Sequence, residues 1–144
     1  MRLYPPVVSA AAAGAMVALD RWGPMARMVP HNWIGTAPAA LGLALMLWAA
    51  WSMHRRGTTL HPHSTPTALV VAGPFRISRN PIYLGSALML AGLAASLGSS
   101  APFAVLAVWV FAMNQLFIQP EEAKLAETFG PEYEAYARKV RRWF

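Results

Sequence analysis

Uncharged, apolar stretches separated by short polar segments predict helices that cross a membrane. Residues 3–19 and 34–53 form two such stretches, and residues 80–120 form a third that carries no charge over 41 positions. About 20 residues span the hydrocarbon core, so the third stretch has room for two helices. Gly98 and Pro102 mark a helix-ending break near its middle. We predict a single all-α membrane domain over residues 1–144, with transmembrane spans near 4–20, 34–53, 82–98 and 102–119.

Composition favours the same class of protein. Hydrophobic residues make up 56% and charged residues 12% of the chain, against about 45–50% and about 25% in soluble domains. These values exclude a disordered chain and argue against a soluble globule. The absence of cysteine excludes disulfides, thiolate metal sites and cysteine nucleophiles. The first stretch also has features of a signal peptide, but Pro5-Pro6 before it, Asp20 after it and the lack of a clear cleavage site favour a span.

The basic residues gather on one predicted side of the membrane. Ten of the twelve Lys and Arg residues lie at the N-terminus, in the 54–80 loop or after Pro120, whereas Arg21 and Arg27 lie between the first two spans. The positive-inside rule therefore predicts that both termini and the 54–80 loop face the cytoplasm, with the protein in the cytoplasmic membrane. Topology and anionic lipid headgroups explain the net charge of +6, so no nucleic-acid partner is expected.

One polar segment precedes the third predicted span. Asn80-Pro81 is a turn signal, and we expect Asn80 to cap the span through its side-chain oxygen. Tyr83 would then lie one turn into the helix, at headgroup depth. The segment is also compatible with a plain interfacial loop in which Arg79 pairs with lipid phosphates.

A second polar segment begins at Pro120, where we expect the fourth span to end. Glu121 and Glu122 would follow at a membrane boundary, where partial desolvation and mutual repulsion favour a cationic ligand. The helix dipole also favours acids at this position, so a structural role stays open. An amphipathic helix is expected over residues 120–144, with a surface ion pair between Glu134 and Arg138. Its apolar face would comprise Leu125, Phe129, Tyr133 and Tyr136.

No metal site, phosphate-binding loop or Ser/His/Asp triad is visible in the sequence. The four histidines, His31, His54, His61 and His63, fall in predicted loops. His61 and His63 are two residues apart and have no acidic partner nearby, a spacing and environment that argue against a zinc site. We predict no bound metal.

Together the two polar segments resemble a known enzyme superfamily. The first reads T-A-L-V…G-P-F-R-x-x-R-N-P-I-Y-L-G, and the second reads E-E-x-x-L-x-x-x-F-G-x-E-Y-x-x-Y-x-x-x-V-x-R-W. In this order, with an apolar hairpin between them, they are similar to the isoprenylcysteine carboxyl methyltransferase and phospholipid methyltransferase superfamily. The resemblance covers about residues 55–144.

The resemblance implies a membrane-embedded methyltransferase that uses S-adenosylmethionine and takes a lipophilic substrate from the bilayer. A carboxylate at Glu121 or Glu122 suits the cationic parts of the cofactor. Catalysis would rest on positioning and on exclusion of water. The catalytic residues implied are Arg79, Glu122 and Arg138. The cofactor-binding residues implied are Thr67, Ala68, Leu69, Val70, Phe75, Asn80, Pro81, Ile82, Tyr83 and Glu121.

Departures from the family pattern bear on the methyl acceptor. Asn80 stands where the eukaryotic carboxyl methyltransferases have His. Phospholipid methyltransferases also have Asn at this position. The carboxyl-methylating enzymes have an Arg four residues before the Glu, where this chain has Phe117. A prenylcysteine carboxylate would lack that partner unless Arg79 or Arg138 replaces it. Carboxylate, amine and thiol acceptors all stay open, as does the oligomeric state.

Two other functions are compatible with the sequence. Sterol reductases carry a similar C-terminal membrane motif, although an NADPH-dependent reductase needs more spans and a basic grip on the 2′-phosphate. A non-enzymatic membrane partner is the other alternative, and its close-packing faces would be the small-residue pairs Ala10/Gly14 and Ala87/Ala91. Whether residues 54–66 form a lid is left open.

Overall fold

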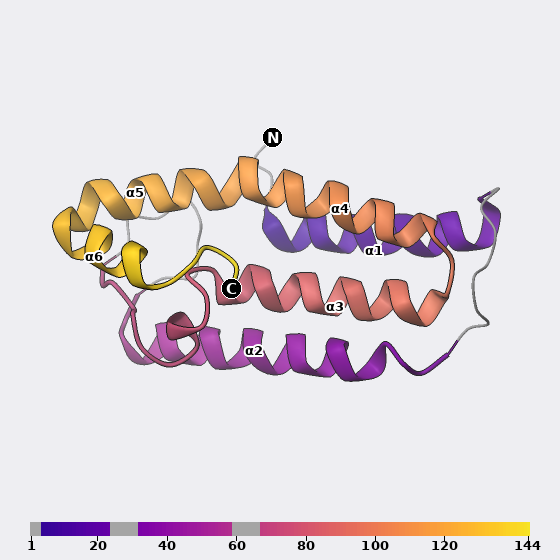
Figure 1. Cartoon of the computed structure of the whole chain (residues 1–144), viewed down its shortest axis with the longest axis horizontal. Helices are drawn as coiled ribbons and strands as arrows, with labels where there is room; N and C mark the ends of the chain where they lie inside the picture. Colours follow the sequence, from indigo (N-terminus) through magenta and orange to yellow (C-terminus); the bar gives the residue numbers. More distant parts are fainter. Residues whose placement is uncertain (1–3, 24–31, 59–66) are drawn as a thin grey trace.

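The computed structural model describes residues 4–23, 32–58 and 67–144, and every element within these ranges is a helix (Figure 1). The all-α prediction is therefore confirmed for the described part of the chain. In chain order the elements are α1 (Pro5–Trp22), α2 (Thr36–Arg55), the 3-10 turn η1 (Gly73–Arg76), α3 (Pro81–Leu97), α4 (Ala101–Met113), the π-helical turn η2 (Asn114–Ile118), α5 (Gln119–Phe129) and α6 (Pro131–Lys139).

Helices α1 to α4 run along the long axis of the molecule, with α3 between α2 on one side and α1 and α4 on the other (Figure 1). The buried core lies between α1, α3 and α4, and includes Met16, Leu90, Trp109 and Met113. The three helices α1, α2 and α3 match the first three predicted segments to within two residues at each end. Gly98 ends α3 with φ +79°, so the predicted break is also confirmed.

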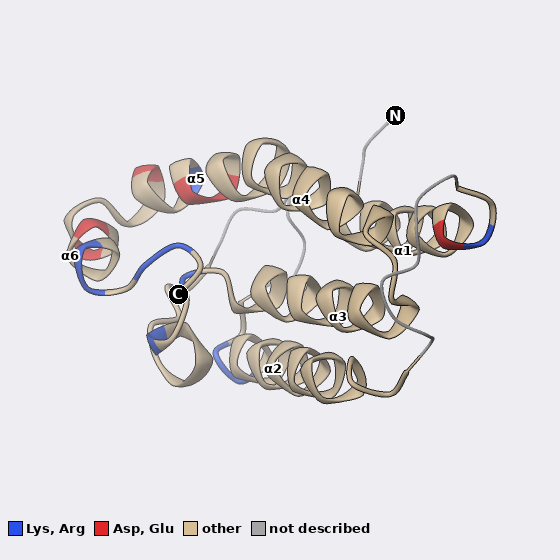
Figure 2. Ribbon diagram, turned by 45° about the vertical axis from the view of Figure 1, so that its right-hand side comes forward, with Lys and Arg blue, Asp and Glu red and all other residues tan. Residues whose placement is uncertain are grey.

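Two described helices are long and apolar enough to cross a membrane. These are α2 and the continuous helix from Ala101 to Phe129, while α3 is apolar but has 17 residues. Large apolar side chains, among them Leu41, Leu47 and Phe111, are exposed on their outer faces. Lys and Arg gather near α6, the C-terminal end of the chain and the end of α2, whereas the last turn of α1, which contains Asp20 and Arg21, lies at the opposite end (Figure 2). An apolar outer surface between two charged ends is typical of a membrane protein.

The fourth predicted span and the helix expected after it form one continuous helix, Ala101–Phe129, which does not stop at Pro120. The helix continues to Phe129 because five residues in its middle form a π-helical turn. In this turn the Gln119 N–H donates to the carbonyl of Asn114, five residues earlier. A proline inside a regular helix lacks a hydrogen-bond donor and crowds the carbonyl four residues before it. The π turn just before Pro120 changes that spacing, so the helix continues past the proline.

The prediction of a single amphipathic helix after Pro120 is wrong. The chain turns at Gly130 and forms two helices, α5 and α6. Gly130 has φ +50°, a conformation that favours glycine, and Pro131 begins α6. As a result Tyr133 and Tyr136 lie on a different helix from Phe129. Glu134 and Arg138 are both exposed, and the described residues include no ion pair between them. An exposed pair gains too little energy to hold two long side chains in one geometry.

Helices α2 and α3 approach each other through glycines. Gly42 faces Gly85, and Gly35, just before α2, faces Gly92. A Cβ atom added to Gly85 would lie 2.5 Å from the carbonyl oxygen of Gly42, so the backbones are in direct contact there. This interface was not predicted. Two other small-residue pairs were predicted as packing faces. Ala87 of the pair Ala87/Ala91 packs against the core, whereas both members of the pair Ala10/Gly14 are exposed.

Candidate functional site

The two predicted polar segments meet where the N-terminus of α3 lies beside α5, and the centre of this meeting is Glu122. One carboxylate oxygen of Glu122 accepts a hydrogen bond from Asn80 Nδ2 at 3.0 Å. The other oxygen accepts two from Arg142, from Nε at 3.0 Å and Nη2 at 2.8 Å. Arg79 Nε lies 3.6 Å from the first oxygen. The Glu122 side chain is 10% exposed, so these charge-assisted contacts stabilise a carboxylate that water scarcely reaches.

Main-chain atoms of the C-terminal tail, residues 140–144, complete this cluster. The carbonyl oxygen of Arg142 accepts hydrogen bonds from Ser78 Oγ at 3.0 Å and from Asn80 Nδ2 at 3.2 Å. The Arg79 N–H donates to the carbonyl of Arg141 at 3.0 Å. Ser78 is fully buried. The tail is therefore fixed to the loop that precedes α3.

Asn80 occupies the predicted N-cap position of α3, but its side chain makes no capping hydrogen bond. The expectation about its side-chain oxygen is therefore wrong. Its amide instead donates to Glu122 and to the Arg142 carbonyl. A hydrogen bond to an ionised carboxylate is about twice as strong as one between neutral groups, which explains this orientation.

Glu121 belongs to a second, separate pair. The Tyr83 hydroxyl donates to Glu121 Oε1 at 2.7 Å, and Tyr83 is 8% exposed. Adjacent residues of a helix point about 100° apart, so Glu121 and Glu122 face different neighbours. The predicted pair of carboxylates thus divides between two partners, a tyrosine hydroxyl and a guanidinium cluster.

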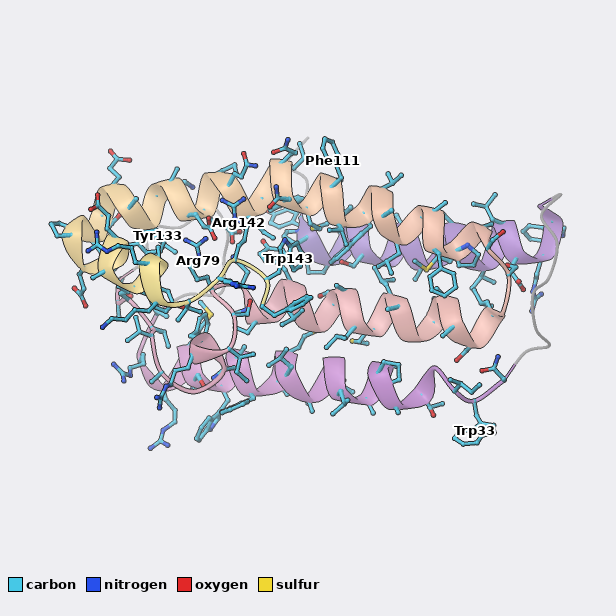
Figure 3. All side chains as sticks on the ribbon, in the orientation of Figure 1. Trp33, Arg79, Phe111, Tyr133, Arg142 and Trp143 are labelled. Carbon is cyan, nitrogen blue, oxygen red and sulfur yellow. The ribbon has the colours of Figure 1, made fainter. Side chains whose placement is uncertain are left out.

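Two buried polar atoms near Glu122 lack a hydrogen-bond partner among the described residues, Arg79 Nε and the Tyr133 hydroxyl. Tyr133 packs edge-on against Tyr136 at 6.2 Å, and the Tyr136 hydroxyl donates to the Phe75 carbonyl at 2.7 Å. Burial raises the pKa of both tyrosines, so both stay neutral donors at physiological pH. In Figure 3 the labelled side chains of Arg79, Tyr133 and Arg142 lie close together beside α5, while Trp33 and Phe111 point away from the bundle.

The structure brings together five of the residues implied by the resemblance, namely Arg79, Asn80, Tyr83, Glu121 and Glu122. Pro81 and Ile82 form the first turn of α3 next to them. Phe75 is connected through its carbonyl to Tyr136. Arg138 is exposed on the last turn of α6.

The segment Thr67, Ala68, Leu69 and Val70 lies in the loop before η1. Val70 is buried, Ala68 and Leu69 are half-buried, and the Thr67 hydroxyl donates to the Gly57 carbonyl at 3.1 Å. Most of the possible lid over residues 54–66 lies outside the described residues, because 59–66 are not described. Also outside the described residues are His31, His61, His63, Arg2 and Arg27.

Arg142 and its partner Asn114 were not predicted from the sequence, whereas its partners Glu122 and Asn80 were. Arg142 Nη1 also donates to Asn114 Oδ1 at 3.2 Å, on the π turn of η2. The signal was present, because the motif quoted for the resemblance ends in R-W, but sequence spacing does not reveal that the tail folds back onto Glu122. Asn114 was missed because it lies inside an apolar stretch.

Comparison with known families identifies the class of protein. The model of the phospholipid methyltransferase family matches residues 30–132. The chain therefore belongs to the phospholipid methyltransferase family, part of the isoprenylcysteine carboxyl methyltransferase-like superfamily, and the predicted resemblance is confirmed.

Three curated proteins illustrate its relatives. The cobalt-zinc-cadmium resistance protein CzcN of Cupriavidus metallidurans is 38% identical over 76 residues, which are 53% of this chain and 35% of that protein. The nickel-cobalt-cadmium resistance protein NccN of Alcaligenes xylosoxydans xylosoxydans is 29% identical over 119 residues, 83% of this chain and 50% of that protein. An uncharacterized protein of Haemophilus influenzae is 37% identical over 62 residues, 43% of this chain and 98% of that protein. The chain thus spans half or less of the two resistance proteins.

Proposed function

We propose that this chain is an integral membrane methyltransferase that transfers a methyl group from S-adenosylmethionine to a lipophilic acceptor. Family membership supports the reaction class. The observation that carries the assignment is the Asn80–Glu122 hydrogen bond, which joins motifs 42 residues apart at the charged end of the bundle. The Tyr83–Glu121 bond beside it places a second carboxylate at the same end.

The proposed topology has four spans, formed by α1, α2, α3 and the apolar part of the helix that begins at Ala101. At 17 residues α3 is about 25 Å long, a little shorter than the hydrocarbon core of about 30 Å. The concentration of Lys and Arg around α6 and the C-terminal tail supports a cytoplasmic position for that end, and thus for both termini (Figure 2). The site would then face the cytoplasmic supply of cofactor.

The described residues fit the charges of S-adenosylmethionine. The carboxylate of Glu121, oriented by Tyr83, suits the α-ammonium group of the cofactor. The buried donors of Arg79, which lies beside Glu122, and of the Tyr133 hydroxyl suit its carboxylate. Half-buried Leu69 and buried Val70 offer apolar surface for an adenine ring. When bound, the cofactor supplies a methyl group activated by a positively charged sulfur.

The contribution of the protein to such a reaction is positioning. Tyr83 and Asn80, on the first turn of α3, orient the two carboxylates on α5, and burial of this end limits the access of water. Phe117 is buried in the core, so that position supplies no cation for a substrate carboxylate. The proposed acceptor is a lipophilic molecule that carries a carboxylate, an amine or a thiol.

Binding of S-adenosylmethionine to the detergent-purified chain tests this proposal. We expect saturable binding that the Glu121→Gln variant weakens by about 1–3 kcal/mol, because the variant removes a charged partner. Glu134→Gln is the matched control, since Glu134 is exposed on α6. NADPH is titrated in parallel. Binding of NADPH instead would favour the reductase, and no binding by folded protein would favour a non-enzymatic membrane partner.

A further inference from the structure

The C-terminal tail makes several hydrogen bonds to the candidate site, most of them through Arg142. The Arg142 guanidinium contacts Glu122 on α5 and Asn114 on the π turn, and its carbonyl contacts Ser78 and Asn80 before α3. One residue of the tail therefore joins the segment before α3 to two points on the continuous helix Ala101–Phe129. Trp143, the next residue, packs against the apolar core and holds the tail in place.

These contacts separate the two carboxylates by role. Glu122 already accepts three hydrogen bonds from Arg142 and Asn80, and Arg79 lies beside it. Its charge is thus compensated inside the protein. Glu121 has a neutral hydrogen-bond partner in Tyr83, and the Lys124 ammonium, one turn further along α5, acts on it electrostatically, whereas a guanidinium binds Glu122 directly. A cationic ligand gains more from a carboxylate that no guanidinium neutralises.

We propose that Arg142 is a positioning residue for the site, and that Glu122 acts with it to hold Asn80 and α5 in register so that Glu121 meets the cofactor. The inference rests on the proposed function, because it assigns roles within the same cofactor site. It replaces a direct catalytic role for Glu122 with a positioning role. It also makes the tail, residues 140–144, a necessary part of the binding site.

The geometry explains why an arginine is needed. The guanidinium has a planar fork of donors, and here Nε and Nη2 bind one carboxylate oxygen while Nη1 reaches Asn114. Asn114 and Glu122 are eight residues apart on the same continuous helix, with the π turn between them. A single flexible ammonium group cannot bridge both acceptors with the same geometry.

The test measures affinity for S-adenosylmethionine in the full-length, detergent-purified protein. We expect Arg142→Ala to weaken binding by about tenfold or more, because displaced binding groups lose productive geometry. Lys139→Ala, which removes an exposed cation three residues away, should bind within twofold of the unmodified chain. Adding ethylguanidinium should restore much of the affinity of Arg142→Ala and leave Lys139→Ala unchanged. Recovery of affinity would show that the loss comes from the missing guanidinium, and no recovery in folded Arg142→Ala would contradict the positioning role.

Ser78→Ala provides a second route if Arg142→Ala does not fold. It removes the hydroxyl that donates to the Arg142 carbonyl but keeps every charge. We expect a smaller loss of affinity, of about threefold to tenfold. Unchanged affinity in folded Ser78→Ala and Arg142→Ala would overturn the inference while leaving the proposed function intact. Absence of binding in the unmodified protein would instead overturn the proposed function, and the inference with it.

Discussion

Helix α3 meets its neighbours in two contrasting ways. Along its length it contacts α2 through facing glycines, Gly85 against Gly42 and Gly92 against Gly35. At its N-terminus it meets α5 and the tail through a buried network of charged and amide groups around Glu122. The first contact depends on shape, because small residues let backbones approach closely in a membrane. The second depends on matched charge, because a buried carboxylate without partners is costly.

The two regions have different roles: the glycine contacts position helix α3, and the polar network at its N-terminus forms the candidate site. The glycine contacts set how closely α3 lies against α2, and the atoms around them belong to the backbone and to uncharged side chains. The polar end uses the resulting position of α3 to place Asn80 and Tyr83 beside Glu122 and Glu121. Substitutions in the two regions should therefore differ in kind as well as in size.

The largest effect is expected at the polar end. Glu122→Ala should lower the free energy of unfolding by about 3 kcal/mol, because Arg142 and Arg79 lose their carboxylate and Asn80 loses an acceptor. Denaturant titration of the detergent-purified protein measures this change. The exposed Glu134→Ala should change it by about 0.5 kcal/mol or less. Equal losses in the two variants would show that the Glu122 network contributes no special stability.

The next effect tests the glycine contact. Gly85→Ala should destabilise the protein by about 1–3 kcal/mol, since the new Cβ would lie 2.5 Å from the Gly42 carbonyl oxygen and the helices must separate. Gly14→Ala is the control, because nothing lies within 4 Å of its added Cβ, and alanine favours a helix interior by about 0.5–1 kcal/mol. The same titration checks both. A neutral Gly85→Ala would mean that α2 and α3 do not pack as described.

The smallest effect concerns Tyr136 at the edge of the polar end. Tyr136→Phe should cost about 1 kcal/mol through loss of the hydrogen bond to the Phe75 carbonyl. Burial raises the pKa of Tyr136 above its ordinary value near 10, which favours the neutral form in the folded state. Its contribution is therefore fully present below about pH 10 and is lost as the pH rises further. Stability measured from pH 8 to 11 should fall less steeply in the variant, and identical slopes would contradict this role.

The sequence predicted the apolar part of the fold well. The lengths of the uncharged stretches placed three helices to within two residues, and Gly98 marked the break between α3 and α4. These features depend on local composition and backbone preference. The continuation of the helix through Pro120 was not predicted, because a proline usually starts or breaks a helix and nothing local in the sequence reveals a π turn that accommodates it.

The candidate site was only partly accessible to sequence reasoning. Asn80, Tyr83, Glu121 and Glu122 could be named because two motifs carry them in order. Their pairing could not, because it depends on which side of α5 each carboxylate faces and on where the tail returns. Arg142 shows the limit most clearly, since its contacts lie 20 and 28 residues away in sequence, on α5 and η2.

The central claim is tested most directly by following the methyl group itself. Membranes containing the chain are incubated with S-adenosylmethionine labelled on its methyl carbon, and label is counted in the organic-solvent extract. We predict label well above that of membranes lacking the protein, lowered by Glu121→Gln at cofactor concentrations that do not saturate the unmodified chain, and retained by the exposed control Glu134→Gln. Background counts from membranes that contain the folded, unmodified protein would contradict methyl transfer to a lipophilic acceptor.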